Sequence, residues 1–124
     1  MKKILLIDDD NQFRILLKRM IESEGYQVDE AENGEKGFLK AQTGNYDLIL
    51  TDVYMPEKDG LEILIELKRS KPDQKILAIS GGPSTPTMVS LNLVKIMEQF
   101  GVDKMLEKPI TKDVLMNAIR QVLD

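Results

Sequence analysis

Short apolar runs that alternate with helical patterns constrain the fold of this chain more than any other feature. Strand-length runs lie at Lys3–Asp8, Gln27–Glu32, Tyr46–Asp52, Lys75–Ser80 and Asp103–Glu107. The first, third and fourth runs carry continuous apolar stretches, which are typical of parallel strands covered on both faces. Gln27–Glu32 alternates weakly and carries three acidic residues, which predicts a charged edge strand. The pattern therefore predicts an α/β domain of (βα)5 form, with a parallel sheet between two layers of helices.

Helical periodicity fills the segments between these runs. We expect helices at Asn11–Glu24 and Gly34–Thr43, from Leu61 onward, from Pro86 to about Phe100, and from Thr111 onward. The residues predicted to cap the first, fourth and last of these helices are Asp10, Thr85 and Thr111. The loop at Met55–Gly60 separates the third strand from the third helix. Each helix therefore returns the chain to the start of the next strand.

The composition excludes several classes of function. The 124 residues suit one domain, 1–124. The chain has no Cys and no His, which excludes disulfides, thiolate or imidazole catalysis, and metal sites built on Cys or His. The net charge of −4 argues against a nucleic-acid or membrane-surface binder. No apolar run approaches the roughly 20 residues of a membrane span, so we expect a cytoplasmic protein.

Polar residues gather at the predicted carboxyl ends of the strands. They are Asp8, Asp9 and Asp10 after the first strand, Asp52 and Ser80 at the ends of the third and fourth, and Lys108 after the fifth. Taken singly, each has an ordinary explanation as a helix cap, a turn residue or a solvated surface group. Parallel strands, however, bring their carboxyl ends to one edge of the sheet, where ligands bind. We therefore expect these groups to form one site.

The chemistry of this site follows from its charge. Three close carboxylates need a cation or raised pKa values. Oxygen ligands alone suit Mg²⁺, which uses one or two carboxylates together with phosphate oxygens. An Asp in such a site can act as a nucleophile and form an acyl phosphate, while a lysine and a hydroxyl neutralise the phosphoryl oxygens. Gly81 and Gly82 leave the backbone free to approach an anion.

The chain resembles the receiver domain of the two-component response-regulator family over essentially all of its length. The resemblance rests on the acidic pair after the first strand, the D-x-x-M-P-x-x-D-G motif that begins at Asp52, the hydroxyl that ends the fourth strand, and the K-P pair after the fifth. It implies a flavodoxin-like three-layer sandwich with strand order 2-1-3-4-5, the order of the chemotaxis regulator.

The resemblance also implies roles for individual residues. Asp52 would be the phosphoacceptor. Mg²⁺, with Mn²⁺ as a substitute, would be held by Asp9, Asp52 and the carbonyl of Tyr54, with Asp8 acting through water. Ser80, Gly81 and Lys108 would bind the phosphoryl group, and Ser80 and Lys108 would assist its transfer. The Lys108–Pro109 bond is expected to be cis, as is usual in the family.

Two features depart from the family pattern. Met105 occupies the position three before the lysine, where most receivers carry Tyr or Phe as an inward-turning switch. In addition, 28 residues separate Ser80 from Lys108, about six more than in a typical receiver, and they lengthen the loop and the fourth helix. In that helix we expect a core-facing stripe made of Val89, Leu93, Ile96, Met97 and Phe100. Three further apolar residues, Met88, Leu91 and Val94, lie outside the stripe. Either the longer loop covers them or they are scattered exposed residues, or they form a surface that binds a partner.

The function that these features favour is that of a single-domain, stand-alone response regulator, not a turnover enzyme. A histidine kinase or a phosphotransfer protein would donate the phosphoryl group, and a downstream protein would read helix four and the Met105 region. We expect a monomer or weak dimer. One alternative is an interaction module that works without phosphorylation. The other is a small Mg²⁺-dependent aspartyl phosphotransferase that acts on an external substrate.

Overall fold

The protein is an α/β domain, described here by a computed structural model that covers residues 1–55, 58–81 and 87–124, apart from the side chains of residues 87–91. The strands are β1 (Lys3–Ile7), β2 (Gln27–Ala31), β3 (Leu48–Asp52), β4 (Ile76–Ser80) and β5 (Lys104–Glu107). The helices are α1 (Asn11–Glu22), α2 (Gly34–Thr43), α3 (Gly60–Ser70), α4 (Thr87–Gln99) and α5 (Lys112–Leu123). Strands and helices alternate along the described chain, as the sequence pattern predicts.

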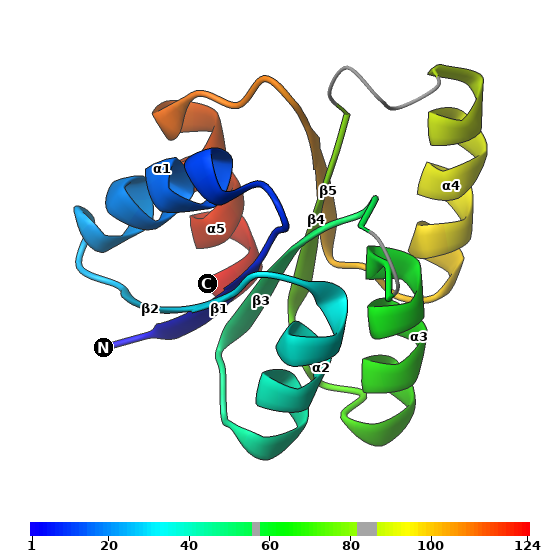
Figure 1. Ribbon diagram of the computed structural model, residues 1–124, viewed down its shortest axis with the longest axis horizontal. Coiled ribbons are helices and arrows are strands. Elements are labelled where there is room, and N and C mark those ends of the chain that lie inside the picture. Colours follow the sequence, from blue (N-terminus) through cyan, green and yellow to red (C-terminus); the bar gives the residue numbers. More distant parts are fainter. Residues whose placement is uncertain (56–57, 82–86) are drawn as a thin grey trace.

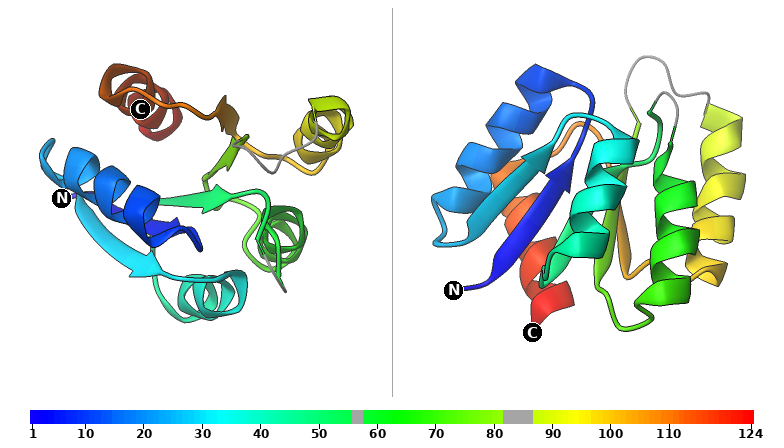
Figure 2. Two further views of the ribbon diagram at one scale, coloured as in Figure 1. Left: turned by 45° about the horizontal axis from the view of Figure 1, so that its top comes forward. Right: turned by 60° about the horizontal axis from the view of Figure 1, so that its bottom comes forward.

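The five strands form one parallel sheet in the order β2-β1-β3-β4-β5. Helices α1 and α5 cover one face, and α2, α3 and α4 cover the other (Figures 1 and 2). The three-layer flavodoxin-like fold and its strand order are therefore confirmed. The charged strand β2 lies at one edge, as predicted. In the part of the chain that the structure describes, no helix is long and apolar enough to cross a membrane.

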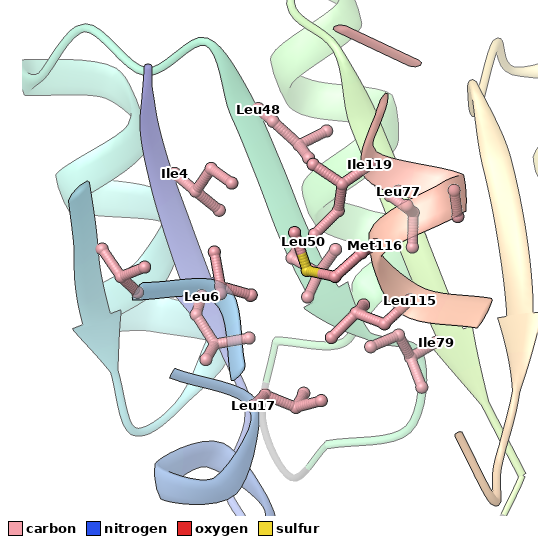
Figure 3. Packing of buried hydrophobic residues seen from close by; sticks show 13 residues of the cluster. Ile4, Leu6, Leu17, Leu48, Leu50, Leu77, Ile79, Leu115, Met116 and Ile119 are labelled. Carbon is pink, nitrogen blue, oxygen red and sulfur yellow. The ribbon is translucent and has the colours of Figure 1, made fainter. Parts of the chain in front are cut away.

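Alternate residues of the inner strands supply two separate cores, because successive side chains of a strand point to opposite faces. In β1, Ile4 and Leu6 face the α1/α5 side, whereas Leu5 and Ile7 face the α2/α3/α4 side. Figure 3 shows the first core, in which side chains of the sheet meet those of α1 and α5. All four β1 side chains are at most 1% exposed. The continuous apolar runs in the sequence thus reflect burial on both faces.

The predicted caps that lie within the described residues are confirmed. The Asp10 carboxylate accepts hydrogen bonds from the backbone N–H groups of Gln12 and Phe13 and so begins α1. The Thr111 hydroxyl accepts the Val114 N–H and begins α5. Such caps satisfy backbone donors that the first helical turn leaves free. The predicted cap at Thr85 and Pro86 lies outside the described residues.

The prediction for the buried face of α4 is wrong in part. Met97 is fully buried and Leu93 packs against the same core, but Ile96 and Phe100 are 38% and 46% exposed. The helix lies at the edge of its layer, near β5 (Figure 1), and among the α4 side chains that the structure describes Met97 is the only fully buried one. The remaining side chain of the predicted stripe, Val89, lies outside the described part.

Candidate functional site

The carboxyl ends of β1, β3 and β4 lie side by side because these strands are parallel neighbours. Asp8 directly follows β1, Asp52 ends β3 and Ser80 ends β4. Their exposed fractions are only 1%, 7% and 7%, respectively. Buried polar side chains on three separate strands are uncommon unless they serve a site. The sheet therefore brings together residues that lie far apart in the sequence, as predicted.

Three aspartates form an acidic cluster at this edge. Asp8, Asp9 and Asp52 each offer a carboxylate oxygen, and these oxygens lie within 4.8 Å of one another. Asp8 and Asp52 are buried, whereas Asp9 is exposed. The third acid of the run, Asp10, is outside the cluster because its side chain caps α1. The predicted cap at Asp10 is thus confirmed, and Asp8 and Asp9 are the acids of the run that lie in the cluster.

Lys108 supplies the cation of the site. Its Nζ lies 3.4 Å from Asp52 Oδ2 and 3.8 Å from Asp8 Oδ2. Its backbone N–H donates to the Ser80 carbonyl at 2.8 Å, which ties the end of β5 to the end of β4. The Lys108–Pro109 bond is cis, as predicted. The ammonium therefore lies close to both buried carboxylates.

Burial raises the pKa of both inner carboxyl groups. For Asp52, burial is the largest cause and the Asp8 charge adds to it, while Lys108 and a hydrogen bond from the Tyr54 N–H act in the opposite direction; together they raise the pKa to about 6. For Asp8, burial again dominates and raises the pKa above its ordinary value. Crowded, buried carboxylates resist ionisation until a cation neutralises them. One lysine is too little charge for three acids.

Gly81 lets the loop after β4 pass close to Lys108. Its φ of +104° lies in the left-handed region, which glycine adopts without strain. A Cβ atom at this position would lie 3.1 Å from the Lys108 backbone nitrogen. At Gly81, therefore, no side chain covers the backbone beside Lys108. Gly82, the second glycine of the predicted anion-binding loop, lies outside the described residues.

The residues present fit a divalent cation such as Mg²⁺. One buried oxygen of the pocket, Asp8 Oδ2, has no hydrogen-bond partner in the described structure, although the Asp10 N–H donates to Oδ1 of the same carboxylate at 2.9 Å. An unpartnered buried carboxylate oxygen is costly. The donor set consists of carboxylate oxygens, which hard cations prefer. Asp8, Asp9 and Asp52 could therefore hold such an ion.

Tyr54 lies two residues beyond Asp52, and its ring packs against the α2/α3/α4 core. Its hydroxyl is buried and has no hydrogen-bond partner among the described atoms. Met105, on β5, is half-buried against the same core. Both side chains thus connect the neighbourhood of the acidic cluster to the helical layer that contains α4.

Sequence reasoning missed two residues beside the pocket. Phe13, which the periodicity places only on a helix face, lies beneath Lys108, with 4.3 Å between Nζ and the ring centroid. Arg14 Nη1 donates to the Asp8 carbonyl at 2.7 Å, and its Nε pairs with Glu30. The contacts with Lys108 and Glu30 have no sequence signal, because each joins segments that only the folded chain brings together. The acidic run itself gives no reason to look at these neighbours.

Comparison with known proteins agrees with this geometry. The family model described as "Response regulator receiver domain" matches residues 4–120. This chain belongs to the receiver-domain family of response regulators. The receiver protein CpdR of Brucella abortus is 36% identical over 123 residues, which are 99% of this chain and 98% of that protein. The resemblance inferred from the motifs is therefore confirmed.

A solved receiver-family structure has the same fold. It is the response regulator TrrA of Thermotoga maritima, solved in complex with Mg²⁺-BeF, with a TM-score of 0.85 and 34% identity over 99% of this receiver and 100% of that chain. Other relatives are longer. The receiver spans 48% of the transcriptional regulatory protein ResD of Bacillus subtilis, to which it is 34% identical over 121 residues, 98% of this chain.

Proposed function

We propose that this receiver accepts a phosphoryl group on Asp52, donated by a histidine kinase or a phosphotransfer protein. One observation carries the proposal: a buried Asp52 carboxylate faces Lys108 at 3.4 Å and two further aspartates within 4.8 Å. The Asp52 carboxylate oxygen attacks phosphorus, the bond from phosphorus to the donor's imidazole nitrogen breaks, and an acyl phosphate forms. The reaction modifies the receiver itself, so the chain is not a turnover enzyme.

The other site residues have the roles that charge and position support. Asp9, Asp52 and the Tyr54 carbonyl would hold Mg²⁺ or Mn²⁺ directly, with Asp8 acting through water. The bound ion would supply positive charge against the phosphoryl oxygens. Lys108 and the Ser80 hydroxyl contact the same oxygens, and the bare backbone at Gly81 gives them room. In this assignment, residues 1–124 act as one receiver domain in the cytoplasm.

Intact-mass spectrometry tests the proposal directly. After incubation with acetyl phosphate and Mg²⁺, we expect one phosphoryl adduct on the wild type, and none with Asp52→Asn or with a chelator present. Asp59→Asn is the matched control, because Asp59 lies in the same loop but only caps α3, a task that Asn also performs. An adduct that persists in Asp52→Asn would contradict the assignment. A folded wild type that no donor modifies would favour the phosphorylation-independent interaction module.

We further propose that phosphorylation is read on the face formed by α4 and the Met105 region of β5, by a downstream protein that binds a monomer or weak dimer. Val94 on α4 and Met105 on β5 are both half-buried, which leaves part of each side chain open to a partner. Met88 and Leu91, the other residues predicted for this face, have side chains outside the described part. Methionine is flexible enough to change rotamer where most receivers turn a ring.

Methyl NMR checks which face responds. On addition of beryllium fluoride and Mg²⁺, we expect the Met105 and Val94 methyl signals to shift, whereas the methyl signals of Leu123, at the far end of α5, stay in place. Met105→Leu assigns the methionine signal. Shifts confined to the loops around the acidic cluster, with Met105 and Val94 unmoved, would contradict this reading.

A further inference from the structure

The ammonium of Lys108 lies between two chemically different surfaces. On one side are the carboxylates of Asp52 and Asp8, at 3.4 and 3.8 Å. On the other is the ring of Phe13, whose centroid is 4.3 Å from Nζ. The Lys108 side chain is only 17% exposed, so water competes little with either contact. An aromatic face attracts a cation most strongly when the pair is shielded from water.

Phe13 is held in this position by two independent contacts. Its backbone N–H donates to the Asp10 carboxylate at 3.1 Å, so the cap that starts α1 also fixes the residue that carries the ring. The side chain packs against the α1/α5 core. The acidic run that supplies Asp8 and Asp9 thus also sets the place of the ring. This leaves the ring little freedom to follow the lysine if the ammonium moves.

We propose that Phe13 is a positioning residue for phosphoryl transfer: its ring face holds the Lys108 ammonium at the pocket. This inference rests on the proposed function of Asp52. A divalent cation among the three aspartates would weaken their attraction for the ammonium and repel it. The ring attraction does not depend on those carboxylates and persists. Phe13 therefore keeps Lys108 within reach of the incoming phosphoryl oxygens once the bound cation has weakened the attraction of the three aspartates for the ammonium.

Fluorinated phenylalanines placed at position 13 separate this role from simple packing. Successive fluorine atoms withdraw electron density from the ring face while changing its shape little. We expect the rate of adduct formation from acetyl phosphate to fall stepwise, by about five- to tenfold over the series. Phe38 is the matched control, because its ring lies 4.2 Å from Lys58 Nζ and contacts a different lysine. The same series at position 38 should leave the rate unchanged.

A second measurement reads the contact without any phosphodonor. The ¹³Cε signal of Lys108, assigned with Lys108→Arg, should shift in Phe13→Leu and stay in place in Phe38→Leu. A rate that is constant across the position-13 series, or that falls equally at positions 13 and 38, would overturn the positioning role. A Lys108 ¹³Cε signal that does not shift in Phe13→Leu would also overturn the positioning role. An absent adduct in the wild type would instead overturn the proposed function of Asp52, while the NMR readout would still judge the contact.

Discussion

Asp52→Asn is expected to make the metal-free protein more stable at pH 7.5, by about 2 kcal/mol in the free energy of unfolding. The reason is the raised pKa of Asp52, about 6 in the folded state against an ordinary value of 3.8. Each pKa unit corresponds to about 1.4 kcal/mol, so the rise of about two units, in which the attraction to Lys108 is already counted, sets an upper bound of about 3 kcal/mol. Asn has nearly the same shape as Asp but carries no charge. The substitution therefore removes the repulsion from Asp8 and the cost of burying a charge.

The pH dependence of this difference has a definite sign. Between pH 4 and 6 the folded state holds a proton on Asp52 that the unfolded state has released. Wild-type stability therefore falls as the pH rises through this window and stays low above it. The gap between Asp52→Asn and the wild type should be small near pH 4 and reach its full size above pH 6. Acids that do not interact with Asp52, such as Glu30 with its lowered pKa, titrate in both proteins and cancel in the comparison.

Urea denaturation in the presence of a chelator, from pH 4 to 8, measures the gap. Asp59→Asn again serves as the control and should stay within about 0.5 kcal/mol of the wild type at every pH, because a capping Asn replaces a capping Asp. Adding Mg²⁺ at pH 7.5 should stabilise the wild type more than Asp52→Asn, since a ligand that binds the folded state stabilises it. Parallel pH curves for wild type and Asp52→Asn would show that Asp52 is not the strained carboxyl.

The sequence predicted the sheet well because burial on both faces leaves a strong local signal. Runs such as Ile4–Ile7 can only be buried strands, and chain connectivity then fixes where the polar residues after them must meet. The charged edge strand and the caps at Asp10 and Thr111 followed from equally local chemistry. Topology placed the whole acidic run beside Asp52, and the family resemblance singled out Asp8, Asp9 and Asp52.

What the sequence did not predict depends on contacts between distant segments. Ile96 and Phe100 match the periodicity of a buried face, but α4 lies at the edge of its layer and covers less of the sheet than the pattern implies. Phe13 likewise fits an apolar helix face, and only the folded chain shows a lysine above its ring, 95 positions later. Periodicity in the sequence indicates which side chains lie on an apolar helix face. It does not predict which residues of other elements those side chains contact.

Gly34→Ala is expected to destabilise the protein by about 3 kcal/mol or more, against the usual preference of helices for alanine. Gly34 is the first residue of α2, and a Cβ atom there would lie 1.6 Å from the backbone carbonyl oxygen of Lys58. A backbone atom cannot turn away as the end of a side chain can. The loop that carries Lys58 must therefore shift, although helix propensity alone would favour alanine by about 1 kcal/mol.

This shift would act near the proposed site, because Lys58 lies between the end of β3, where Asp52 is, and the start of α3. Its Nζ pairs with Glu66, on α3, at 2.6 Å. Tyr54, whose carbonyl is the proposed metal ligand, lies only four positions before Lys58. We therefore expect Gly34→Ala to slow adduct formation at low Mg²⁺ and to recover in part at high Mg²⁺, as measured by intact mass.

Gly25→Ala is the matched control for the stability change, since nothing lies within 4 Å of its missing Cβ. Its φ of +93° makes alanine strained, so a loss of about 1 kcal/mol is expected there without any effect on phosphorylation. The two substitutions are thus expected to destabilise the protein for different reasons. At Gly25 the reason is the backbone conformation, and at Gly34 it is the close approach of the Lys58 backbone. Urea denaturation that found Gly34→Ala as stable as the wild type would mean that α2 and the Lys58 loop do not pack as tightly as the structure has them.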